Sequence, residues 1–155
     1  MSDIALFLNG VYESVLDEIL RAQEREHDDT FYLQPYKSVA MARFRQDPPT
    51  ILYVSTGKNL AEVSYRADIV GWMDKRRMDK NSPEWKRIDK SIREGGYDPG
   101  IYGAEEGMVN LVFIQRLVKL ASPFSVSRLI KISDGNPLST NRTRSGGWSY
   151  VIKSE

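Results

Sequence analysis

The chain has 155 residues and a formal net charge of +1, a length that fits one domain with a hydrophobic core of its own. It contains no cysteine and a single histidine, His27, which excludes thiol catalysis, disulfides, thiolate metal sites and two-histidine sites within one chain. No apolar run is long enough to span a bilayer and the N-terminus does not resemble a signal peptide. We therefore expect one domain over residues 1–155, cytoplasmic, with no metal or cofactor.

The first half of the chain shows two strand patterns and two helix patterns. Apolar residues over 4–8 predict a buried strand, and Asn9-Gly10 is expected to end it. Helical spacing from Tyr12 to about Glu26 predicts an amphipathic helix with an acidic first turn. A short strand is expected over 31–36, followed by a brief helix over 37–45.

The clearest pattern in the sequence is a hairpin over residues 50–77. β-branched and aromatic residues predict a strand over 51–56, turn residues occupy 57–59, and alternation resumes from Ala61 to Trp72. A glycine, Gly71, directly precedes Trp72. This predicts a bulge that re-aims the tryptophan side chain.

The second half combines charged, glycine-rich and apolar segments. Ser82-Pro83 predicts a helix start, with the helix ending near Glu94, and 97–107 is expected to be an ordered loop. A buried strand is expected from Val109 towards Leu120, a turn at Ser122-Pro123, a short helix over 126–130 and a last strand over 148–152. Strands outnumber helices, and helices interrupt them irregularly. The pattern predicts an α+β fold on a curved, mostly antiparallel barrel.

Charge is unevenly distributed along the chain. Residues 1–30 hold 8 acidic and 2 basic residues, and residues 31–155 hold 13 acidic and 20 basic ones, so the two segments carry −6 and +7. Such separation is typical of a nucleic-acid-binding face opposite an acidic one. An acidic solvated helix with ordinary surface lysines explains the counts equally well.

Four motifs in this order carry a resemblance to a known superfamily: FYLQPY at 31–36, PPTILYVST at 48–56, ADIVGW at 67–72 and GGWSYVI at 146–152. They resemble the PUA-like superfamily, whose branches include the EVE, ASCH and YTH domains, and look closest to bacterial EVE-like proteins. The resemblance covers most of the chain. It implies a pseudobarrel with short flanking helices, a concave cleft and binding of RNA or DNA, including modified bases in an aromatic-lined pocket.

Such a pocket needs aromatic planes for the base, polar groups for its edge and cations for the backbone. The candidate planes are Trp72, Trp148, Tyr32 and Tyr36. The candidate edge-reading residues are Asn9, Gln34, Ser55, Thr56 and Asp68. The candidate phosphate-binding residues are Lys58, Lys75, Arg76, Arg77, Arg142 and Arg144. Together they predict a cleft between the hairpin and the closing strand.

Alternatives remain open for these residues. Trp148 suits a core as well as a site, a core role for Trp72 is the more common one at a strand end, and the 31–36 strand equally suits an exposed edge. A resemblance to ASCH-type hydrolases acting on RNA or acylated nucleosides would place Thr56, Lys58 and Glu62 in an active site, with Lys58 as a base activated by burial. The third alternative is a protein-interaction domain without a pocket.

Overall fold

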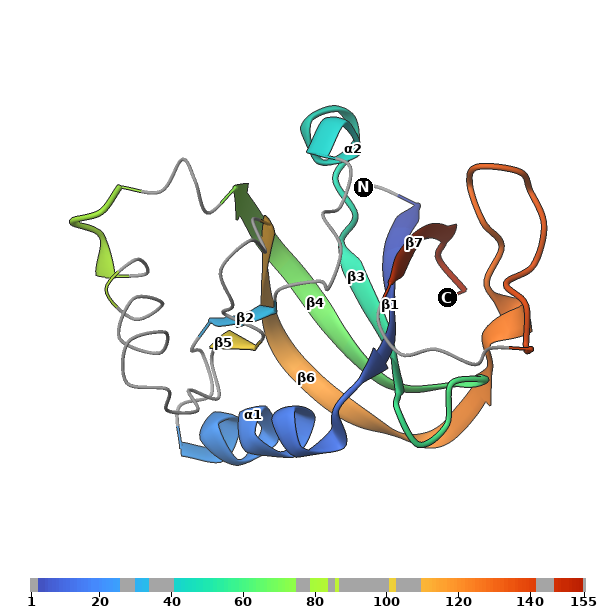
Figure 1. Ribbon diagram of the computed structural model, residues 1–155, viewed down its shortest axis with the longest axis horizontal. Coiled ribbons are helices and arrows are strands. Elements are labelled where there is room, and N and C mark those ends of the chain that lie inside the picture. Colours follow the sequence, from blue (N-terminus) through green and yellow to red (C-terminus); the bar gives the residue numbers. More distant parts are fainter. Residues whose placement is uncertain are drawn as a thin grey trace.

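One curved, mixed sheet of seven strands runs through the chain, in the order β5-β2-β6-β4-β3-β1-β7 (Figure 1). The computed structural model describes residues 3–25, 30–33, 41–74, 79–83, 86, 101–102, 110–141 and 147–154. The strands are β1 (Ile4–Val11), β2 (Phe31–Leu33), β3 (Ile51–Thr56), β4 (Glu62–Asp74), β5 (Ile101–Tyr102), β6 (Asn110–Ser125) and β7 (Trp148–Ile152). The helices are α1 (Glu13–Arg25), α2 (Met41–Gln46) and the 3-10 helix η2 (Val126–Arg128).

The sheet is mostly antiparallel, since only the β1–β3 and β2–β5 pairings are parallel. The predicted α+β class is confirmed. The described sheet is not closed into a barrel, because it ends at β5 and β7, which do not pair with each other. The pseudobarrel class stays a prediction. The outer edge of β7 instead bonds to the segment after η2: Ile132 N donates to Tyr150 O, and Ile152 N donates to Ile130 O. The segment after η2 therefore occupies this edge of β7.

Most of the predicted elements in the described ranges are present, and several have limits that differ from the prediction. β3 and β7 match their predicted ranges, and η2 confirms the short helix. β1 continues through Asn9-Gly10 to Val11, because the register with β3 shifts there and Gly10 takes a left-handed φ of 71°. Ser122-Pro123 does not form a turn but lies inside β6. Within the described ranges, no helix combines the length and apolar character needed to cross a bilayer.

Irregular pairing bends β6, which sweeps under the other strands and along α1 (Figure 1). The β4–β6 register shifts between Val63 and Tyr65 and between Arg66 and Asp68, and in both places β6 carries the extra residues. Arg116 lies in the second shift with a left-handed φ of 55°. Bulges of this kind bend and twist a strand, so they account for the curvature of the sheet.

A side chain from α1 stabilises that second bulge. Gln23 Nε2 donates to Leu117 O at 2.8 Å, and Leu117 N donates to Gln23 Oε1 at 2.7 Å. The bulge takes the Leu117 backbone out of the ladder with β4, and the glutamine amide replaces the missing strand partner. The helix and the bend of β6 therefore depend on each other.

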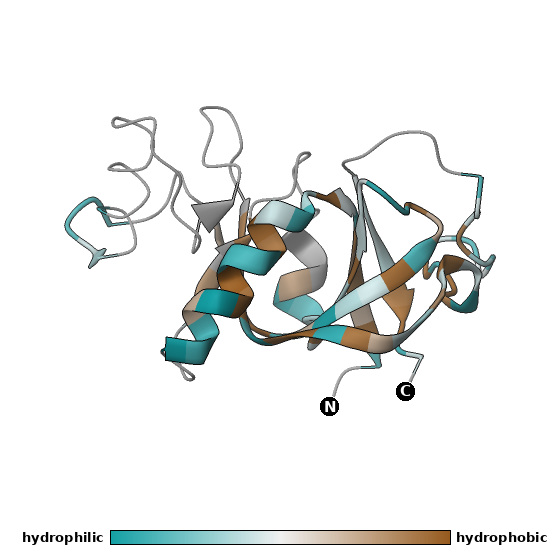
Figure 2. Ribbon diagram, turned by 90° about the horizontal axis from the view of Figure 1, so that it is seen from below, coloured by the Kyte–Doolittle hydropathy of each residue, from teal (hydrophilic) through white to brown (hydrophobic). Residues whose placement is uncertain are grey.

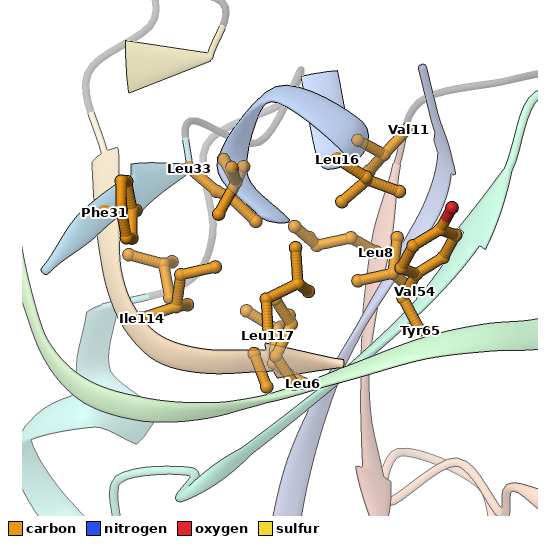
Figure 3. Close-up of a cluster of buried hydrophobic side chains, with 14 of the residues drawn as sticks. Leu6, Leu8, Val11, Leu16, Phe31, Leu33, Val54, Tyr65, Ile114 and Leu117 are labelled. Carbon is orange, nitrogen blue, oxygen red and sulfur yellow. The ribbon is translucent and has the colours of Figure 1, made fainter. Parts of the chain in front are cut away.

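The sheet is covered by apolar groups on both faces. On β1, Leu6 and Leu8 join the core beneath α1, whereas Ala5 and Phe7 join the core beside η2. Figure 3 shows the first core, in which Leu16 of α1 belongs to one cluster with side chains of β1, β2 and β6. Hydrophobic and hydrophilic residues alternate along α1 with helical spacing, as its position on the sheet requires (Figure 2). Burial on both faces explains why β1 and β3 are mostly apolar, with every residue of both strands buried.

Replacing the bridging glutamine should destabilise the protein. Gln23→Met removes both hydrogen bonds and leaves the partly buried Leu117 amide and carbonyl without these partners, at a cost of about 2–4 kcal/mol. Urea denaturation measures the free energy of unfolding. Glu24→Met, at the next and exposed position of α1, is the control and should change it by less than about 0.5 kcal/mol. Equal effects of the two substitutions would contradict the role given to Gln23.

Tyr65 should make stability depend on pH in the alkaline range. Burial, with Asp17 and Glu13 nearby, raises the pKa of Tyr65 from 10.0 to about 12. The unfolded chain releases this proton near pH 10 while the folded protein keeps it, so stability falls as pH rises from 10 to 12, by up to about 2 kcal/mol. The free energy of unfolding of Tyr65→Phe, measured by urea denaturation, should fall less over this pH range than that of the wild type. Tyr12→Phe, at a 60% exposed position, should behave like the wild type.

Candidate functional site

The predicted bulge at Gly71 is present and decides where Trp72 points. Ile69 pairs with Ile114 and Trp72 pairs with Val112, so Val70 and Gly71 together face the single residue Phe113. In a regular strand Ile69 and Trp72 would lie on opposite faces. The extra residue puts both against the core beneath α1.

Four aromatic rings form a row across this face. The centroids of Trp72 and Phe44 are 5.4 Å apart, those of Phe44 and Tyr150 6.1 Å, and those of Tyr150 and Trp148 5.2 Å. Phe44 of α2 is 2% exposed, whereas the other three side chains are partly exposed. Phe44 and Tyr150 therefore connect Trp72 of the hairpin with Trp148 of the closing strand.

A cavity lies beside the β7 end of this row. Its volume is about 550 Å³, it is open to one side, and it is lined by Lys131, Ile132, Ser133, Trp148, Ser149 and Tyr150. The chain bonds to β7 at Ile132 but then turns, as Gly135 N donates to Lys131 O, and leaves β7 before it reaches Trp148. This divergence opens the space. Its volume lies within the range of roughly 300–1,000 Å³ usual for small-molecule sites.

The cavity carries one ion pair at its margin. Lys131 Nζ lies 2.9 Å from Asp134 Oδ2, and Asp134 Oδ1 accepts a hydrogen bond from Asn136 N at 2.9 Å. Two contacts hold the pKa of Asp134 below its usual value. The larger cause is the backbone hydrogen bond from Asn136, and the next is the contact with Lys131. Asp134 is therefore an anion at neutral pH, and it fixes the lysine at the edge of the aromatic surface.

The predicted edge-reading residues of β1 and β3 are buried elsewhere. Ser55 is 0% exposed; its Oγ donates to Asn9 Oδ1 and accepts from Gly10 N. Thr56 is 3% exposed and bridges to the turn that follows β3. Asn9 does contribute to the site through its backbone, because Asn9 N donates to Gly147 O and so anchors the start of β7.

Lys58 and Asp68 are engaged in ion pairs. Lys58 Nζ lies 3.0 Å from Glu13 Oε2, and the lysine side chain is 84% exposed. It precedes β4, whereas Trp72 lies near the far end of that long strand. The hydrolase alternative requires a buried Lys58, so this geometry does not favour it. Asp68 lies between the guanidinium groups of Arg66 and Arg116.

The remaining predicted residues are described only in part or not at all. The backbone of Tyr32 pairs with Phe113 and Ile101, which places it in β2 between β5 and β6. The other predicted residues outside the described ranges are Gln34, Tyr36, Lys75, Arg76, Arg77, Arg142 and Arg144. Their roles stay predictions.

Sequence reasoning missed three residues of the site. Tyr150 follows Trp148 by two positions and so shares its face of β7, a signal that was available in the sequence. Phe44 showed only the spacing of a packing residue. Lys131 lies in no recognisable pattern, and only the pairing with β7 brings it to the cavity.

No family model, no curated protein and no solved structure matches this chain. In the part of the chain that the structure describes, no group of three or more histidine or acidic residues is placed to hold a metal ion. The aromatic row and the cavity beside it are therefore the features of the structure that bear on function.

The bulge that orients Trp72 should be sensitive to a single added methyl group. A Cβ on Gly71 would lie 3.1 Å from Phe113 Cδ2, closer than ordinary packing allows. Gly71→Ala should destabilise the fold by roughly 1–2 kcal/mol and change the near-UV circular dichroism of the tryptophans. Gly57→Ala is the control, since its Cβ would meet only Gly10 O at 4.0 Å. An unchanged spectrum for Gly71→Ala would show that the bulge does not control the ring.

Proposed function

We propose that the chain is a PUA-like nucleic-acid-binding module that holds one nucleobase, including a modified one, against Trp148 and Tyr150. The observation that supports this function best is the cavity at the end of the aromatic row. It combines two partly exposed rings with polar side chains, which is the combination that base recognition requires.

The two rings offer a base two kinds of contact. Their planes meet at 72°, so a base stacked on one ring presents its edge to the other. Neither ring is buried completely, although both pack against the core. That arrangement gives a rigid platform at low entropic cost, and it favours a binding site over the pocketless interaction domain.

The distribution of charge is consistent with a nucleic-acid partner. In Figure 1 the acidic helix α1 lies at the lower left of the sheet, and the segment that follows η2 lies at the right. No described residue of α1 lines the cavity. The PUA-like class belongs to the same proposal, and the strongly curved sheet with a helix on its concave side supports it.

Binding of short single-stranded RNA and DNA, with and without base modifications, tests the proposal by fluorescence anisotropy at low salt. Loss of one stacking ring costs about 1–3 kcal/mol, so Trp148→Ala should weaken binding by roughly tenfold or more. Trp148→Phe keeps a ring and should retain most of the affinity. Trp72→Ala should have a smaller effect, because Trp72 acts through Phe44 and Tyr150.

Tyr12→Ala removes an exposed aromatic side chain on another surface and should leave binding unchanged. Circular dichroism establishes that each variant is folded. A wild-type protein without affinity for any of the nucleic acids at low salt would overturn the proposal.

A further inference from the structure

Lys131 gives the cavity an unusual electrostatic character. Of the lining residues that the structure describes, it alone carries a charge. That charge is balanced at 2.9 Å by Asp134, which also accepts from Asn136 N and so cannot turn away without breaking its own turn. The pair as a whole is close to neutral.

Building on the function proposed above, we infer that this cavity selects bases with an oxo group at the edge it reads, namely guanine, hypoxanthine, uracil and thymine, over adenine and cytosine. Lys131 is the residue that makes this distinction, and it does so as a hydrogen-bond donor to the base.

A base edge suits this lysine better than a phosphate does. A phosphate at Lys131 would also approach the Asp134 carboxylate, and the repulsion would offset much of the attraction. An uncharged base avoids that repulsion. The ammonium group has three N–H donors, of which one points to Asp134, so others remain for a ligand.

The donor-only chemistry of lysine then sets the preference. Guanine presents O6 and N7 as acceptors, and thymine presents O4. Adenine and cytosine place an amino group at the corresponding position, and its N–H donors would face the ammonium donors. The hydroxyl groups of Ser133 and Ser149 can donate or accept, so they fit either kind of base and do not reverse the preference.

Single-stranded oligonucleotides that differ at one central base test the inference. Hypoxanthine against adenine, and uracil against cytosine, exchange an oxo group for an amino group with little change in shape. The wild type should bind the oxo member of each pair roughly tenfold more tightly. Lys131→Met should remove this preference without changing the slope of affinity against salt concentration, because no phosphate contact is lost. Lys131→Gln, which adds an acceptor, should also bind both members nearly equally.

Lys119→Met removes an exposed lysine outside the cavity and should leave the preference intact. Asp134→Asn retains an oxygen for Asn136 N and keeps Lys131 as a donor, so the preference for the oxo member of each pair should remain. Equal binding of both members of each pair by the wild type would overturn the inference. So would a uniform loss of affinity with a shallower salt slope in Lys131→Met, which marks a phosphate contact. Either result leaves the proposed function standing, whereas a failure to bind any oligonucleotide removes the function itself.

Discussion

The bend in β6 is the constraint on which the rest of the structure depends. In the sheet order, β3 and β1 lie between β4 and β7, so a flat sheet would hold β4 and β7 roughly 14 Å apart. In the bent sheet one phenylalanine ring spans the space between Trp72 and Tyr150. The extra residues of β6 near Arg116, and the glutamine of α1 that bonds to Leu117, bend the strand that pairs with β4, and Trp72 of β4 begins the aromatic row.

Trp148 belongs both to the packing of the core beneath α1 and to the lining of the cavity. The sequence left a core role and a ligand role as alternatives, and a strand at the edge of a curved sheet allows both. A rim aromatic of this kind needs no rearrangement to receive a ligand, because packing has already fixed its orientation.

Local chemistry decided which parts of the fold the sequence could predict. The hairpin and the Gly71 bulge were predictable, because the residues that favour a strand or a bulge lie within a few positions of one another in the sequence. The bend at Arg116 was not predictable, since an arginine takes a left-handed conformation there. The hydrogen-bond partner of the neighbouring Leu117 is Gln23, which lies 94 positions away in the sequence. The prediction of a turn at Ser122-Pro123 is wrong, because an irregular strand can include a proline. The candidate site followed the same rule: Trp148 was found from its neighbours, whereas Phe44 and Lys131 join the site only through tertiary contacts.

The pairing of β1 with β7 has a consequence for how the protein is made. β1 is the first strand and β7 follows every other strand in sequence, yet the two are neighbours across their whole common length. During synthesis, the edge of β1 that β7 covers stays open until residues 148–152 have left the ribosome. Pairing between such distant segments is slow, and an open edge rich in apolar residues is prone to aggregation meanwhile. The cavity beside β7 therefore cannot form before β7 itself has been synthesised, because three of its lining residues belong to that strand.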